Sequence, residues 1–102
     1  MFVLQIAKHS PETCPVTDPK YKAVTLKWFE KLNELAAKHK MKVIGAWNDH
    51  PGHAMYIIYE TPSMDAFMQY GMEPECLATL AFNTVRNLHV LSAAEALALL
   101  KR

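Results

Sequence analysis

Two histidines flank a predicted tight turn near the middle of the chain, in the segment NDHPGH at residues 48–53. Proline presets the first central position of a type II turn, and glycine supplies the positive φ that the second position requires. His50 and His53 are then the two ends of the turn, with Cα atoms less than about 7 Å apart. Two imidazoles brought together in this way are able to bind a metal ion or to exchange protons near neutral pH.

The composition limits the classes of function. The chain has 102 residues, and one domain covering residues 1–102 is expected from this length. Its 11 basic and 10 acidic side chains nearly balance, which disfavours binding to nucleic acid. No apolar run approaches the roughly 20 residues that a membrane span needs. The apolar start at residues 1–7 is short and lacks a basic flank, so it is interpreted as a strand. Two cysteines without a secretory signal predict reduced thiols and a cytoplasmic location.

The hydrophobic pattern predicts the element order β-α-β-β-α-β, followed by a C-terminal helix. Asp18 as N-cap and Pro19 in the first turn begin a helix of about 20 residues with a clear apolar stripe. A capping box at residues 92–95 begins the last helix, for which Leu97 and Leu100 are expected to provide the apolar contact. Strands are expected at residues 2–8, 42–48, 54–60 and 83–91, and further helical segments at 64–70 and 74–80.

This order is that of a ferredoxin-like α+β domain, a four-stranded antiparallel sheet with helices on one face. The face without helices still carries apolar residues, and a second copy of the chain is the simplest cover for it. In element order and size the chain resembles the dimeric α+β barrel superfamily, in which two such sheets pack face to face. The resemblance implies a homodimer. The superfamily includes small monooxygenases, haem-degrading proteins and muconolactone isomerase-like proteins, so the resemblance says more about fold than about activity.

The usual strand order of this topology, 4-1-3-2, gathers several metal-ligand residues at one end of the sheet. His9 ends the first strand beside His53, which begins the third, and His50 leaves the second strand at the same end. Cys14 lies in the loop after His9, and Cys76, shortly before the fourth strand, is expected to return toward it. Imidazole and thiolate ligands together suit zinc, copper or iron. These five residues are therefore the candidate metal site.

The same end of the sheet allows other chemistry. His9 or His53 is a candidate general acid or base. Glu12 is a carboxylate that could orient an imidazole, and Cys14 a thiolate that His9 could activate. Purely structural roles compete with these: solvated histidines, an inert loop thiol and, for Cys76, a small buried apolar side chain. The sequence does not decide whether the chain is an enzyme.

Two aromatic residues suggest a further site. Trp47 and Tyr59 belong to the predicted second and third strands and are candidates to line a cavity, either between sheet and helices or between two sheets. Aromatic walls with a histidine at the mouth suit a flat apolar ligand such as haem. Three functions remain open: a homodimer that binds a transition metal or small ligand at the His/Cys cluster, a haem-handling or monooxygenase-like enzyme, and a non-enzymatic assembly or regulatory module.

Overall fold

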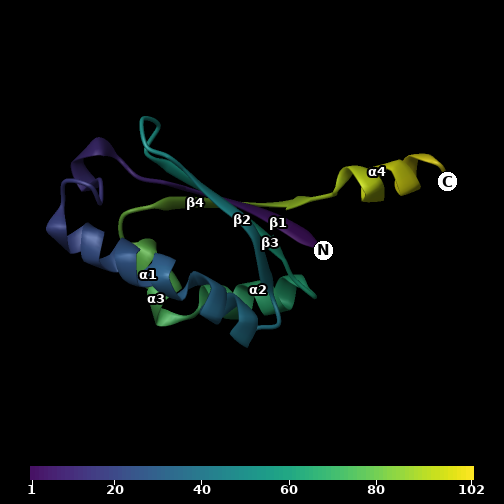
Figure 1. The fold of residues 1–102 in the computed structure, drawn as a ribbon, viewed down its shortest axis with the longest axis horizontal. Helices are drawn as coiled ribbons and strands as arrows, with labels where there is room; N and C mark the ends of the chain where they lie inside the picture. The colour runs from purple at the N-terminus through teal and green to yellow at the C-terminus, as the bar shows by residue number, and fades with distance from the viewer.

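A four-stranded antiparallel sheet forms the centre of the computed structural model, which describes residues 1–102 (Figure 1). The strands lie in the order β2-β3-β1-β4, which confirms the predicted ferredoxin-like arrangement. Every predicted strand is present within one residue of its expected bounds. None of the helices combines the length and the apolar character needed to cross a bilayer. In chain order the elements are β1 (Phe2–Lys8), the short 3-10 helix η1 (Pro11–Thr13), α1 (Pro19–Lys38), β2 (Lys42–Asp49), β3 (Ala54–Glu60), α2 (Met64–Gly71), α3 (Pro74–Thr79), β4 (Thr84–Val90) and α4 (Ala93–Leu100).

Helices α1, α2 and α3 cover one face of the sheet (Figure 1). The Asp18 carboxylate caps α1 by accepting hydrogen bonds from the backbone N–H groups of Lys20 and Tyr21, at 2.9 and 3.3 Å. This places the predicted apolar stripe of α1 against the sheet, where Trp28 and Leu32 are buried. The hydrophobic core lies between this helix layer and the sheet.

The strand register assigns each side chain of β1 to one of two faces. Val3 pairs with Tyr59, and both are fully buried under the helices. Alternate residues point to the opposite, open face, because side chains alternate along a strand. No helix covers this open face, although it is largely apolar. Its apolar residues are Phe2, Leu4, Ile6, Trp47, Tyr56, Ile58, Leu88 and Val90.

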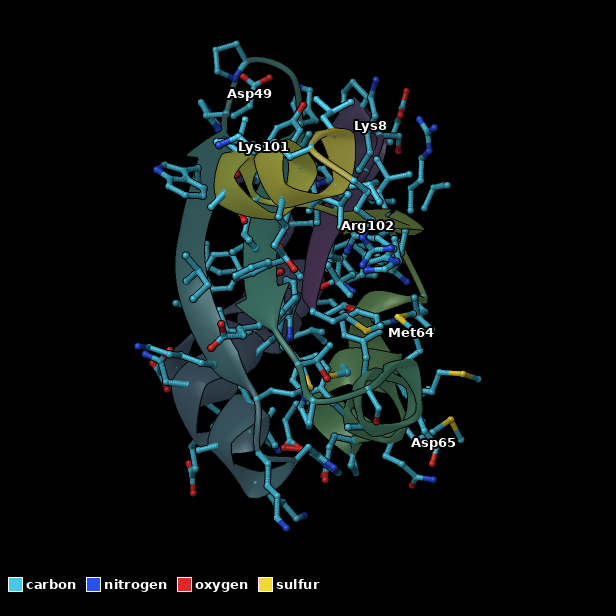
Figure 2. The ribbon with its side chains drawn as sticks, turned by 90° about the vertical axis from the view of Figure 1, so that its right-hand side faces the viewer. Lys8, Asp49, Met64, Asp65, Lys101 and Arg102 are labelled. Atoms are coloured by element: carbon cyan, nitrogen blue, oxygen red, sulfur yellow. The ribbon has the colours of Figure 1, made fainter.

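Helix α4 extends away from the rest of the chain (Figure 1). Its capping box between Ser92 and Glu95 forms as predicted. The expected apolar contact of Leu97 and Leu100 is wrong for the single subunit, because these side chains are 53% and 82% exposed. The physical reason is the direction of β4, which carries the chain past the end of the sheet. Figure 2 looks from this end, with α4 and the two residues that follow it, Lys101 and Arg102, in front of the sheet.

The turn at residues 50–53 forms, but its geometry differs from the predicted type II turn. The His53 N–H donates to the His50 carbonyl at 3.2 Å, yet the positive φ, 53°, falls at His53 and not at Gly52. This fits a type I turn followed by a left-handed residue. Asp49 favours this form, because its carboxylate accepts a hydrogen bond from the Gly52 N–H at 3.1 Å. A Cβ atom at Gly52 would collide with that carboxylate.

A chain of hydrogen-bonded polar side chains begins in the core beneath β3 and ends at the exposed Asn87 on β4. The Tyr59 hydroxyl donates to Gln5 Oε1 at 2.9 Å and lies 2.7 Å from the Tyr70 hydroxyl. The Gln5 amide in turn donates to Asn87 at 3.1 Å. Burial raises the pKa of both tyrosines, so the hydroxyls stay protonated and serve as donors. The chain ties α2 to three strands of the sheet.

Replacing Tyr59 with phenylalanine should lower the free energy of unfolding by about 1–3 kcal/mol, because it leaves buried polar partners unpaired. Urea unfolding measures this change. Tyr56→Phe is the matched control, since Tyr56 lies on the open face and makes no side-chain hydrogen bond. Equal destabilisation by the two substitutions would contradict a stabilising role for the hydrogen bonds of the Tyr59 hydroxyl.

Candidate functional site

The pairing of β1 with β3 brings two histidines together just beyond the strands. Lys8 pairs with Ala54, and the next backbone hydrogen bond, from the His9 N–H to the His53 carbonyl, is 3.0 Å long. The two imidazole rings are in edge contact, with centroids 5.2 Å apart. His9 and His53 therefore meet as the predicted topology requires.

Cys14 completes a group of three possible metal ligands. It follows η1, where its N–H donates to the Pro11 carbonyl and its own carbonyl accepts from Asp18 N–H at 2.9 Å. These bonds hold its buried side chain toward the histidines. Cys14 Sγ and one ring nitrogen of each of His9 and His53 all lie within 4.8 Å of one another. Tetrahedral zinc ligands lie about 3.3–3.8 Å apart, so small side-chain rotations would close the group around an ion.

The hydrogen bonding of the two histidines is incomplete. His9 Nε2 and His53 Nδ1 are buried and have no hydrogen-bond partner. Buried polar atoms are nearly always paired, so an unpaired one needs an explanation. Two such nitrogens beside a buried thiol are explained if a metal ion accepts their lone pairs.

The surroundings keep His9 neutral, the form that binds metal. Burial is the main cause that lowers the pKa of His9, and the nearby imidazoles of His53 and His50 lower it further. The Asn83 side chain opposes this effect by stabilising the protonated form. A histidine that loses its proton readily competes less with a metal ion for its own lone pair.

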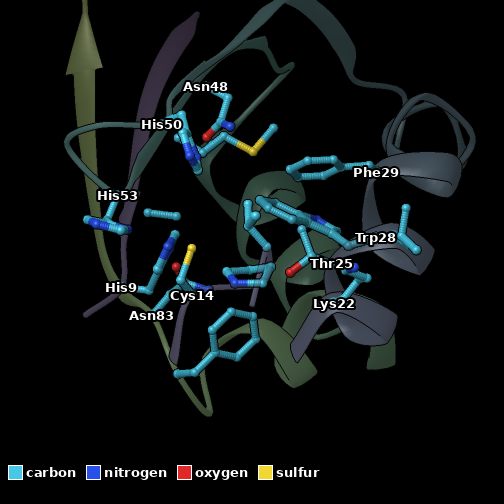
Figure 3. A pocket seen from close by; sticks show the side chains of 16 residues that line it. His9, Cys14, Lys22, Thr25, Trp28, Phe29, Asn48, His50, His53 and Asn83 are labelled. Carbon is cyan, nitrogen blue, oxygen red and sulfur yellow. The ribbon is translucent and has the colours of Figure 1, made fainter. Parts of the chain in front are cut away.

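A cavity of about 320 Å³ opens from the three ligands toward α1. Figure 3 shows His9, Cys14 and His53 on one side of it and the α1 residues Thr25 and Phe29 on the other. Eight of its sixteen lining residues are hydrophobic, and most of the others carry polar side chains. The lining residues are Ala7, His9, Cys14, Pro15, Val16, Lys22, Thr25, Leu26, Trp28, Phe29, Asn48, His50, His53, Met55, Phe82 and Asn83.

The other predicted ligand and acid–base residues lie outside this group of three ligands. His50 lines the same cavity, with its ring centroid 6.3 Å from that of His53, but it lies outside the three-residue ligand group. The expected return of Cys76 to this end is wrong. Cys76 is buried in the core with Trp28, on the face of α3 that also buries Thr79. Glu12 is exposed on η1 and makes no hydrogen bond to an imidazole.

Trp47 and Tyr59 lie on opposite faces of the sheet, because the register puts Trp47 beside Tyr56 and Tyr59 beside Val3. Trp47 is 58% exposed on the open face, whereas Tyr59 is fully buried under the helices. Neither lines the cavity. One cavity within a single subunit therefore cannot use both residues as its walls.

Several cavity residues were not identified from the sequence. Lys22, Thr25 and Phe29 line it from α1, at steps of three and four that follow one helical face beside the core stripe. Asn83 was also missed. It precedes Thr84, which pairs with Lys8, so Asn83 lies beside His9. Strand register identifies such a residue only when the pairing is known.

No family model matches the chain, and no curated protein sequence matches it. Solved structures do share its fold. An antibiotic biosynthesis monooxygenase superimposes with a TM-score of 0.52 at 14% identity, over 89% of this chain and 98% of that one. A NIPSNAP domain protein from Burkholderia xenovorans gives a TM-score of 0.53 at 10% identity, over 91% and 96%. Rv0793 from Mycobacterium tuberculosis gives 0.50 at 13% identity, again over 91% and 96%. The chain thus has the ferredoxin-like α+β fold of these proteins.

Acidification should destabilise the metal-free protein through His9. Because its folded pKa lies below the ordinary value of 6.5, the unfolded chain binds more protons as the pH falls through 6.5. The free energy of unfolding then decreases until the pH is below the folded pKa. Urea unfolding at about pH 7.5 and about pH 5.5 measures the decrease.

In His9→Gln, the free energy of unfolding should fall less between these two pH values than in the parent protein. His89→Gln, on β4 at the far end of the sheet, is the control and should show the same fall as the parent. An NMR titration should place the pKa of His9 below 6.5. A pKa at or above that value would contradict this account of the site.

Proposed function

We propose that the protein is a homodimer that binds one transition-metal ion per subunit at His9, Cys14 and His53. The observation that carries the metal site is the pair of buried, unpartnered imidazole nitrogens beside a buried thiol. The ligand atoms of the three residues already lie within 4.8 Å of one another. The cavity next to them supports a role in binding a small ligand at or near the ion.

The donor set favours particular metals. Two imidazoles and one thiolate suit zinc, copper or iron and disfavour magnesium or calcium, which prefer oxygen ligands. Three protein ligands leave one position open, as in catalytic zinc sites and unlike closed structural ones. In this site the open position would face the cavity. His50 lines that cavity and is the nearest further imidazole.

Cobalt(II) should bind stoichiometrically to protein prepared without a histidine tag, and a thiolate-to-cobalt absorption band should appear. Cys14→Ser should abolish this band, because Cys14 supplies the thiolate. His9→Ala and His53→Ala should each weaken binding by about tenfold or more, since each removes a direct ligand. Absorbance titration measures both effects, and competition with zinc and copper ranks the metals.

The matched controls are the other cysteine and a remote histidine. Cys76→Ala and His89→Ala should retain the band and the affinity, because neither residue belongs to the ligand group. Absence of stoichiometric cobalt, zinc, copper and iron binding would refute the metal site. A band that survives Cys14→Ser would refute the ligand assignment.

The open face of the sheet supports the homodimer. Only 16 of 102 residues are buried in the single subunit, although 51% of the residues are hydrophobic. The molecule measures 51 × 29 × 17 Å, so its thinnest dimension is little more than one sheet and one helix layer. A contiguous apolar face of this kind marks an interaction surface. A second copy placed face to face would cover Trp47 and the central open-face side chains Leu4 and Ile58.

Sedimentation at micromolar concentration should show a dimer. Ile58→Asp should convert it to a monomer, because the substitution buries an unpaired carboxylate at the centre of the interface. Met68→Asp is the matched control, since Met68 is 66% exposed on α2 at a different surface. A monomeric parent protein, or equal effects of the two substitutions, would contradict the proposed dimer.

A further inference from the structure

The cavity has a second polar end that the proposed metal site does not use. Lys22 and Thr25 lie about one helical turn apart on α1 and line the side opposite His9 and Cys14 (Figure 3). The Thr25 hydroxyl is buried and has no hydrogen-bond partner. A buried hydroxyl without a partner costs free energy. A bound ligand that accepts its hydrogen bond would remove this cost.

All four buried side-chain polar atoms that lack a partner belong to residues that line this cavity. Two are the imidazole nitrogens of the proposed metal site, and one is the Thr25 hydroxyl. The fourth, the indole N–H of Trp28, lies on the core side beside Tyr70 and Cys76. Of these four atoms, the Thr25 hydroxyl is therefore the one left for a ligand at the α1 end of the cavity.

The charge of the cavity favours an anion. No aspartate or glutamate lines it, and its one permanently charged side chain is Lys22. An ammonium group and a hydroxyl on the same helix face offer two hydrogen-bond donors to one acceptor group. A carboxylate matches this pair, because charge-assisted hydrogen bonds to a carboxylate are short and strong. At this α1 end of the cavity, an organic cation would find no carboxylate to pair with.

The walls between the two ends favour a flat apolar body. The Trp28 and Phe29 rings lie 5.4 Å apart, and the Phe82 ring is held by a contact with Tyr21 at 4.4 Å. Aromatic rings prefer offset or edge contacts with other rings at such distances. A cavity of about 320 Å³ is at the small end of ligand pockets, so it suits a body of one or two rings.

We infer that the cavity binds a small aromatic carboxylate. Its carboxylate accepts hydrogen bonds from Lys22 Nζ and Thr25 Oγ1, and its ring lies between Trp28 and Phe82. The far edge of the ring then points toward the His/Cys group. The inference rests on the proposed function in that both use one cavity, but the carboxylate contacts come from α1 and do not need the metal.

Isothermal titration calorimetry of the metal-free protein with 2-naphthoate tests this inference. One molecule should bind per subunit, and the neutral analogue 2-naphthalenemethanol should bind about tenfold more weakly or worse. Lys22→Met and Thr25→Val should each weaken 2-naphthoate binding by a similar factor. Lys27→Met is the matched control, because Lys27 is, like Lys22, an exposed lysine of α1 but does not line the cavity. It should leave the affinity unchanged.

A stability measurement separates lost contacts from lost folding. Thr25→Val is nearly isosteric and removes an unpaired buried hydroxyl, so its free energy of unfolding should equal or exceed that of the parent protein. Equal affinities for the acid and the alcohol, absence of binding, or a loss on His53→Ala without a loss on Lys22→Met would each overturn the inference. Cobalt binding by the same preparation tests the metal site separately, so the two failures are distinguishable.

Discussion

The register between β1 and β3 is the constraint on which the candidate site depends. The hydrogen bond from the His9 N–H to the His53 carbonyl continues that register beyond the last paired residues, Lys8 and Ala54. Residues 44 positions apart are thereby fixed side by side. Because side chains alternate along a strand, a slip of one residue would move either histidine to the other face. The buried pairing of Val3 with Tyr59 opposes such a slip, since it would expose two core side chains.

The two faces of the sheet serve separate purposes. The helix-covered face holds the core, the buried tyrosine chain and the cavity with its His/Cys group. The open face carries the apolar residues that we assign to a second subunit. Since no ligand of the proposed metal site comes from the open face, metal affinity and subunit association can change independently. This separation is a physical reason why one fold can carry unrelated functions.

The sequence determines the elements more reliably than it determines the site. Capping residues such as Asp18 and Ser92 and alternating strands depend on local chemistry, so their predicted positions agree with the structure. The turn at His50 was correctly located, but its type depends on the Asp49 carboxylate, and proline at the first central position fits both forms. Cys76 was misplaced because the phase of a short helix decides which side its residues face. Thr25 and Asn83 became visible as cavity residues only through tertiary packing.

Helix α4 has few contacts within the single subunit that could stabilise it. It has eight residues and no buried side chain in the single subunit. Isolated helices this short are unstable in water, because nucleation costs more than a few hydrogen bonds return. Its capping box lowers that cost without removing it. If a second subunit provides the missing contacts, the C-terminal ten residues would fold on association and unfold on dilution. Far-ultraviolet circular dichroism would then vary with protein concentration, and protease access to the C-terminus would report the fraction of free subunits.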